Sequence, residues 1–131
     1  MKKLFMLYGF CLVFVAGFGR RQRHIEASGS VGCCYRFPGQ REICSTPTRA
    51  KIELYDHYYF WEDHLLAEIE LEERTSYDLE WDGLRLFRIS PYFKLRLECP
   101  HGEILEKRHD IFEENPKKIF QNFNIFVPQK T

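Results

Sequence analysis

The chain has 131 residues, and its 19 basic and 19 acidic residues give it no formal net charge. This balance gives no support for nucleic-acid binding, which usually accompanies a surplus of basic residues. Hydrophobic residues make up 44% of the chain and aromatic residues 16%, which is enough to build a core without a cofactor and excludes a disordered chain.

Residues 1–19 have the layout of a cleaved export signal. A positive start is followed by an apolar run over residues 4–16 and by small residues at Gly17 and Gly19. The alternative is a membrane anchor, but a spanning helix needs about 20 apolar residues, and this run is shorter and ends in Arg20. We therefore predict a secreted, extracellular protein with no transmembrane segment in the mature chain.

Residues 20–38 open with a basic run, Arg20-Arg21-Gln22-Arg23, and are polar and glycine-containing up to Ser30. We interpret residues 20–38 as a flexible basic lead that precedes the domain. The basic run also fits the Arg-x-x-Arg pattern of secretory processing proteases, although a solvated charge run is the favoured interpretation. The sequence therefore does not determine which residue is the first of the mature chain.

From about residue 39 the dominant hydrophobic period is two, which is typical of half-buried strands. Weaker strand signals cover residues 84–89 and 104–112, and turn signals such as Asn115-Pro116 separate the runs. The pattern favours an all-β, antiparallel sandwich or barrel over residues 39–131. The residues predicted to face inward are, in chain order, Ile52, Leu54; Leu65, Ala67, Ile69, Leu71; Tyr77, Leu79, Trp81; Phe93, Leu95, Leu97, Cys99; and Ile119, Gln121, Phe123, Ile125, Val127.

Residues 62–74 are rich in Leu and Glu and could form a helix by propensity alone. Their apolar residues nevertheless keep the period of two, with glutamates on the opposite face, so the second half is predicted to be a strand. The connection before it carries four consecutive aromatic residues, Tyr58, Tyr59, Phe60 and Trp61.

Four cysteines follow the export signal: Cys33, Cys34, Cys44 and Cys99. An even number in an exported chain predicts disulfides. A bridge between the adjacent Cys33 and Cys34 would close a strained small ring, which disfavours that pairing. Cys99 shares an inward face with Leu97, and Cys44 ends the first candidate strand, so we predict a Cys44–Cys99 disulfide. Cys33 and Cys34 would then be left for a second protein or, under strain, for each other.

Six short motifs occur in order over residues 39–127: Cys44, Ala50 to Asp56, Glu62 to Glu68, Ile89 to Lys94 leading to Cys99, Asn115 to Phe120, and Asn124-Ile125. This ordered set resembles the secreted transthyretin-like proteins of nematodes. Two features of that family are missing, namely its Asp-x-Asp-Gly-x-Phe turn and a further cysteine shortly after the one that matches Cys99, and Cys33-Cys34 is extra. The resemblance implies a transthyretin-like (prealbumin-like) antiparallel β-sandwich of seven or eight strands, an extracellular setting, and a family mostly without an assigned activity.

A rigid sandwich with variable loops suits a non-enzymatic extracellular binding or adaptor protein, whose partner would be an extracellular protein or a cell-surface ligand. The aromatic residues 58–61 are candidates for partner binding, and the alternative is that they cap the sandwich core. The alternative function is a carrier of a small apolar ligand or lipid, which in transthyretin requires a tetramer. Candidate partner-binding residues are Tyr58, Tyr59, Phe60, Trp61 and His101.

No catalytic, metal-binding or cofactor-binding residue is predicted. The sequence has no Gly-x-Ser-x-Gly, no His-Glu-x-x-His and no phosphate-binding loop, and its five histidines are scattered without metal-ligand spacing. Hydrolases of 5-hydroxyisourate share the transthyretin fold, but their terminal Tyr-Arg-Gly-Ser is absent. Cys99 and His101 could in principle serve as nucleophile and base, although a disulfide is the favoured role for Cys99 in an exported chain. We therefore expect no enzyme.

Overall fold

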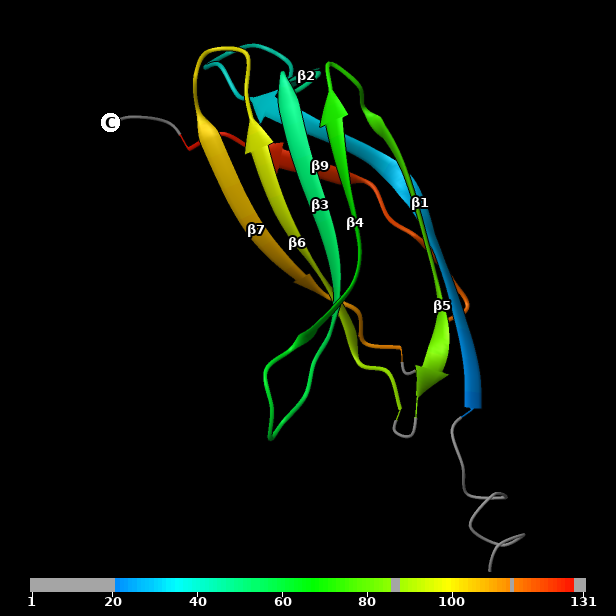
Figure 1. The fold of residues 1–131 in the computed structure, drawn as a ribbon. Helices are drawn as coiled ribbons and strands as arrows, with labels where there is room; N and C mark the ends of the chain where they lie inside the picture. Colours follow the sequence, from blue (N-terminus) through cyan, green and yellow to red (C-terminus); the bar gives the residue numbers. More distant parts are fainter. Residues whose placement is uncertain (1–20, 86–87, 114, 129–131) are drawn as a thin grey trace, which may run out of the picture.

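The computed structural model describes residues 21–128, apart from residues 86, 87 and 114 (Figure 1). Within these residues all regular structure is β-strand, and the strands form two sheets that pack on a shared core, which confirms the predicted all-β class. The predicted export signal, residues 1–19, lies outside the described residues. The described part of the chain contains no helix with the length and apolarity needed to cross a membrane.

The first sheet is built around one long strand, β1. β1 pairs antiparallel with β2 and β5 and parallel with β8 and β9, and this parallel pairing was not expected from the sequence. The five strands are β1 (Arg21–Tyr35), β2 (Ile43–Ser45), β5 (Ser76–Arg85), β8 (Lys118–Phe120) and β9 (Phe123–Phe126).

The second sheet has the order β4-β3-β6-β7 and is antiparallel throughout. Nine strands are thus present in the described residues, whereas seven or eight were expected, and β2, β8 and β9 are only three or four residues long. The strands of this sheet are β3 (Arg49–Asp56), β4 (His64–Glu72), β6 (Pro91–Glu98) and β7 (Ile104–Asp110).

The prediction of a flexible lead over residues 20–38 is wrong, because β1 occupies residues 21–35 and is the longest strand. Alternate residues of β1 enter the core: Ile25, Ala27 and Val31 are each at most 2% exposed. The intervening side chains are short or polar, so the average hydrophobicity of the segment is low although its period is that of a half-buried strand.

The core between the sheets is aromatic at its centre. Phe93 is fully buried, and its ring centroid lies 5.3 Å from that of Phe123 and 6.3 Å from that of Tyr77. These rings come from β6, β9 and β5, so they connect the two sheets. The predicted inward faces of β3, β5 and β6 are confirmed, since the residues predicted to face inward on these strands are buried or half-buried.

The strand predicted in the second half of residues 62–74 is confirmed as β4, but the inward placement of Leu65 is wrong. The register between β3 and β4 shifts at Leu54/Tyr55, so that Leu65 pairs with the outward-facing Tyr55. Such a bulge inserts one residue and exchanges the faces on either side of it. Leu65 is consequently 38% exposed, and Leu66 packs against the core in its place.

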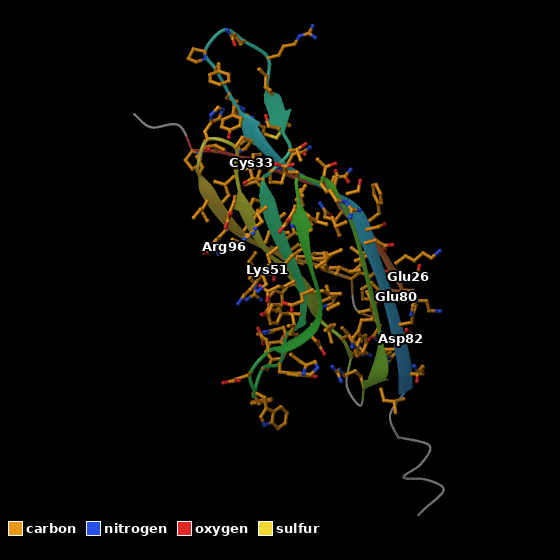
Figure 2. The ribbon with its side chains drawn as sticks, turned by 45° about the horizontal axis from the view of Figure 1, so that its top comes forward. Glu26, Cys33, Lys51, Glu80, Asp82 and Arg96 are labelled. Carbon is orange, nitrogen blue, oxygen red and sulfur yellow. A yellow bond between two sulfur atoms is a disulfide. The ribbon has the colours of Figure 1, made fainter. Side chains whose placement is uncertain are left out.

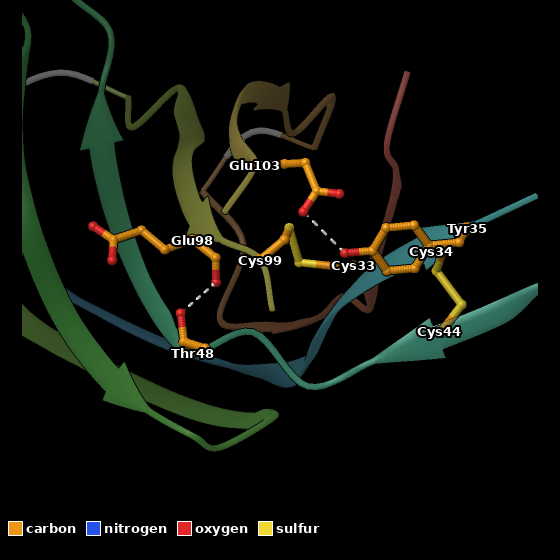
Figure 3. Close-up of a disulfide and its surroundings, with 8 residues drawn as sticks. All are labelled: Cys33, Cys34, Tyr35, Cys44, Thr48, Glu98, Cys99 and Glu103. Carbon is orange, nitrogen blue, oxygen red and sulfur yellow. Dashed lines mark hydrogen bonds between the residues drawn. A yellow bond between two sulfur atoms is a disulfide. The ribbon is translucent and has the colours of Figure 1, made fainter. Parts of the chain in front are cut away.

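The predicted Cys44–Cys99 disulfide is also wrong. The structure joins Cys33 to Cys99 and Cys34 to Cys44 (Figure 3). Successive side chains of a strand point to opposite faces, so the two neighbouring cysteines of β1 meet different partners. Cys33 faces inward and links β1 to the end of β6 in the other sheet, whereas Cys34 is the direct cross-strand partner of Cys44 on β2.

Candidate functional site

The connection between β3 and β4, residues 57–63, is termed here the aromatic loop, and it extends beyond one end of the two sheets (Figure 1). Its tip is apolar and open to solvent: Tyr59 is 83% exposed, Phe60 88% and Trp61 70%. The rings of Phe60 and Trp61 meet edge to face, with centroids 6.3 Å apart. The interpretation that these aromatic residues cap the core is therefore wrong for these three residues.

Tyr58 differs from the other aromatic residues of the loop because it is half-buried and belongs to the root of the loop. Its hydroxyl group interacts with the carboxylate of Asp56, the last residue of β3. Burial and the neighbouring Asp56 carboxylate both raise the pKa of Tyr58. Tyr58 therefore anchors the loop, and three of the four aromatic residues predicted to bind a partner remain free to do so.

Asp63 closes the aromatic loop. Its Oδ1 accepts a hydrogen bond from the backbone amide of Tyr58 at 3.1 Å and lies 2.9 Å from Nδ1 of His57, while its Oδ2 accepts from the hydroxyl of Tyr92. The Tyr92 hydroxyl is the main reason why the pKa of Asp63 is lowered, with the other two contacts contributing in the same direction. Asp side chains that accept hydrogen bonds from nearby backbone amides fix the conformation of turns.

A buried polar group lies beneath the loop. Asp56 is only 1% exposed, and its Oδ1 accepts a hydrogen bond from the amide of Ser90 at 2.9 Å. Its Oδ2 lies 3.8 Å from Nε of Arg85, whose guanidinium stacks on the Trp81 ring. Burial raises the pKa of Asp56, whereas the Ser90 amide and the Arg85 charge act in the opposite direction. These contacts connect β3, β5 and the start of β6 under the loop.

His101, the fifth predicted contact residue, lies at the other end of the molecule. β3 and β6 are antiparallel, with Asp56 opposite Pro91 at the loop end and Arg49 opposite Glu98 at the other, and His101 follows that second end. Its ring packs edge to face on Tyr35, with centroids 5.3 Å apart. The structure therefore does not bring His101 together with the aromatic loop.

A hypothetical nucleophile–base pair of Cys99 and His101 is not available, because the sulfur of Cys99 is bonded to Cys33. A shallow groove of about 450 Å³ crosses the outer face of β3, β6 and β7. Both signs of charge line it, for example in the ion pair of Arg96 with Glu106. Five of its lining side chains are basic and two are acidic, so this open groove carries a basic surplus.

Side chains with metal-ligand chemistry are found on the first sheet, away from the aromatic loop. Among the described residues, His24, Glu26 and Glu80 form a group whose ligand atoms all lie within 4.8 Å of one another. The sequence pattern did not point to it, because the group is assembled across two strands that are more than fifty residues apart in the chain. Side chains two residues apart in a strand share a face, so an assignment of this segment as a strand places His24 and Glu26 together on its outward face.

The fold and the bridges define a two-sheet, all-β protein stabilised by disulfides, a class typical of extracellular proteins. No protein-family model matches the chain, and no curated protein matches it.

Two solved structures are similar to it in outline. One is an alternative pilotin from the type II secretion system of Vibrio cholerae, with 12% identity over 84% of this chain and 100% of that chain and a TM-score of 0.49. The other is a 9R-lipoxygenase from Cyanothece PCC8801, with 6% identity over 81% of this chain but only 17% of that chain and a TM-score of 0.41. Neither is described as a transthyretin-like protein, and likenesses this remote assign no family and no function.

Proposed function

We propose that the chain is a secreted, non-enzymatic binding protein of the transthyretin-like type, which recognises an extracellular protein through the tip of its aromatic loop. The observation that carries this proposal is the exposure of Tyr59, Phe60 and Trp61 at 70–88% on a loop whose root is fixed. Neighbouring exposed apolar side chains mark interaction sites more often than isolated ones do.

The energetics of the tip favour a protein partner. Burying one large apolar side chain contributes about 1.5–3 kcal/mol, and Trp and Tyr are enriched among the residues that dominate binding energies. The contacts of Asp63 with the Tyr58 amide and the Tyr92 hydroxyl hold the loop before any partner arrives. A preorganised loop loses less conformational entropy on binding than a mobile one.

The extracellular setting is supported by the two disulfides, Cys33–Cys99 and Cys34–Cys44, because bridges of this kind persist in oxidising compartments. The predicted export signal at residues 1–19 also supports an extracellular setting.

The transthyretin-like assignment is supported by the way in which the matching motifs meet. Three separate motifs contribute Asp56, Asp63 and the Ser90–Tyr92 segment, and these residues contact one another at the root of the aromatic loop. The resemblance itself rests on the ordered motifs of residues 39–127.

The test compares binding of the fluorescently labelled mature protein with intact cells, before and after the cells are treated with a protease. We expect the triple variant Tyr59→Ser, Phe60→Ser, Trp61→Ser to bind at least about 30-fold more weakly than the wild type, since loss of a single dominant contact costs about 2 kcal/mol or more. Protease treatment should remove the wild-type signal.

The matched control is Phe120→Ser, because Phe120 is 75% exposed but lies on β8 of the first sheet, outside the aromatic loop. It should bind like the wild type. Equal binding by the triple variant and the wild type would contradict the proposal. A protease-resistant signal would indicate a lipid or glycan ligand instead, and a tetramer that retains a small apolar molecule in light scattering and mass spectrometry would favour the carrier.

A further inference from the structure

Four titratable side chains gather on the outer face of the first sheet and are termed here the His24 cluster: His24 and Glu26 of β1 with Glu80 and Asp82 of β5. Figure 2 labels Glu26, Glu80 and Asp82 on these two strands. In the antiparallel register, His24 is opposite Asp82 and Glu26 is opposite Glu80. Like charges directly opposite each other on neighbouring strands are destabilising. Lys118 of β8 is the partner of Glu26 on the other side of β1, and a cation between Glu26 and Glu80 would be stabilising in addition.

The imidazole of His24 is held in a defined orientation within this cluster. Its Nδ1 lies 2.5 Å from Oδ1 of Asp82, and because a carboxylate only accepts hydrogen bonds, the Nδ1 hydrogen belongs to that contact. The other nitrogen, Nε2, lies 3.0 Å from Oε1 of Glu26 and 3.7 Å from Oε1 of Glu80. When the imidazole is protonated, Nε2 donates a hydrogen bond to Glu26. In the neutral imidazole its lone pair faces two carboxylate oxygens, and a metal ion among the three atoms would replace the proton and remove that repulsion.

We propose that the His24 cluster binds a divalent transition-metal ion of the zinc class, with His24 Nε2 and the carboxylates of Glu26 and Glu80 as ligands. The three ligand atoms already lie within 4.8 Å of one another. One imidazole nitrogen with two carboxylate oxygens is a ligand set that Zn²⁺ accepts, whereas Ca²⁺ and Mg²⁺ prefer oxygen ligands alone. Asp82 is a positioning residue, because a carboxylate on the second imidazole nitrogen orients the ring and strengthens it as a ligand.

The cluster is accessible and rests on rigid elements. The side chains of His24, Glu26 and Glu80 are 38%, 47% and 63% exposed, so an ion can enter from solvent without opening the fold. All three are on paired strands rather than loops, which keeps the ligand atoms near one another. Three protein ligands leave a fourth tetrahedral position for water or for a group of another molecule.

The experiment titrates the untagged mature protein, with its disulfides formed, with ZnCl₂ in an isothermal calorimeter, and repeats the titration with CaCl₂ and MgCl₂. The wild type should bind one Zn²⁺ and bind Ca²⁺ and Mg²⁺ far more weakly. Asp82→Asn should weaken Zn²⁺ binding about 10- to 100-fold, and His24→Asn should weaken it by at least as much. The bound ion should also shift the His24 ring resonances in NMR spectra.

The matched control is Asp78→Asn, since Asp78 lies two residues before Glu80 and is exposed on the same face of β5. It removes the same charge as Glu80→Gln but no proposed ligand. Zinc affinity should fall in Glu80→Gln and stay unchanged in Asp78→Asn. Equal losses in these two variants, unchanged affinity in His24→Asn, or equal binding of Zn²⁺ and Ca²⁺ would each overturn the proposal and leave only a diffuse acidic surface.

Discussion

At the scale of single residues, the two bridges that start from Cys33 and Cys34 differ in what they connect. Cys33–Cys99 spans 66 residues and joins the two sheets through the core, while Cys34–Cys44 spans 10 residues within one sheet. The stabilisation that a bridge provides through the entropy of the unfolded chain grows slowly with the length of the closed loop.

We therefore predict that Cys33→Ala with Cys99→Ala lowers the free energy of unfolding by about 4 kcal/mol, and Cys34→Ala with Cys44→Ala by about 3 kcal/mol. Urea unfolding of the two double variants measures both values. Non-reducing peptide mapping of the wild type is the direct check on the pairing, and a peptide that joins Cys44 to Cys99 would contradict the structure.

Gly29 is the point at which β1 passes closest to the segment between β8 and β9. A Cβ atom at this position would lie 1.8 Å from the backbone oxygen of Gln121 and 3.1 Å from the ring of Tyr77. That oxygen also accepts the Tyr77 hydroxyl hydrogen bond at 2.6 Å, so it has little freedom to move.

Gly29→Ala should consequently destabilise the fold by about 3 kcal/mol or more, since forcing atoms into a packed region costs at least 1–3 kcal/mol. Thermal and urea unfolding measure the loss. Gly29 also has a positive φ, of 156°, so its backbone conformation is a second possible cause of the loss. Gly39→Ala separates the two causes, because Gly39 has a positive φ but no atom within 4 Å of its missing Cβ. A loss for Gly39→Ala that equals that of Gly29→Ala would show that backbone conformation, and not the close approach, determines the effect.

Residue by residue, the sequence predicts burial better than it predicts contacts. Alternation placed Phe93, Leu95 and Leu97 correctly, because burial depends on the face of one strand. The cysteine partners and the His24 cluster depend on which strands are neighbours and in what register, and that information is not local in the chain.

At the scale of elements, the aromatic loop is joined to the sandwich by a charged group. The Tyr92 hydroxyl, above all, holds the pKa of Asp63 below its ordinary value of 3.8. The lowered pKa in the folded state means that the ionised carboxylate stabilises the fold at pH values above the ordinary value. This stabilisation is lost as the pH falls through the folded-state pKa.

Asp63→Asn should therefore cost about 2 kcal/mol at neutral pH, where hydrogen bonds to a charged acceptor are worth about 1.5–3 kcal/mol. The difference in the free energy of unfolding between Asp63→Asn and the wild type should become smaller as the pH falls below 3.8. Urea unfolding over this pH range measures the difference. Glu62→Gln is the control, because Glu62 is an exposed neighbour of Asp63. If the difference in the free energy of unfolding between Asp63→Asn and the wild type stayed constant with pH, the role of the charge would be contradicted.

A strand could be predicted from the sequence where apolar and polar residues alternate clearly along it. β6 alternates Phe and Leu with charged residues and was predicted from the sequence, as was β4 against its helix propensity. β1 was missed because Ala27, Gly29 and Ser28 give a weak contrast between its faces and because a basic run precedes it. The exposure of the aromatic tip was left open by the sequence, since exposed and core-capping aromatic residues have the same composition.

At the scale of the whole molecule, β1 holds the first sheet together, and the domain therefore begins well before the predicted boundary at residue 39. One side of β1 pairs with β2 and β5, and the other with β8 and β9. Removing it would expose the inward faces of these strands and eliminate both disulfides.

A chain that starts at residue 39 should consequently show no cooperative thermal transition and no near-ultraviolet circular dichroism, whereas one that starts at Arg21 should show both. The two-state unfolding of small domains makes this comparison decisive. A cooperative transition in the shorter chain would contradict the central place of β1.

The class of the whole molecule followed from local patterns, whereas its topology did not. Short alternating strands with turn signals between them indicated an antiparallel sandwich or barrel, and the structure has two sheets, of which the first also contains parallel pairs. The parallel pairing of β1 with β8 and β9 joins the two ends of the domain, and no periodicity within either segment specifies it.

The position of β1 also has a consequence for how quickly the chain can fold. The Ser30 amide donates a hydrogen bond to Asn122, 92 residues further along, so one side of the first strand finds its partners only after the last strands have been synthesised. Folding slows as the mean sequence separation between contacting residues increases, because long loops must close before their contacts form. During that interval the free edge of β1 can pair with another chain. Refolding yield should therefore fall steeply with protein concentration, even for a protein that is stable once its two sheets have closed.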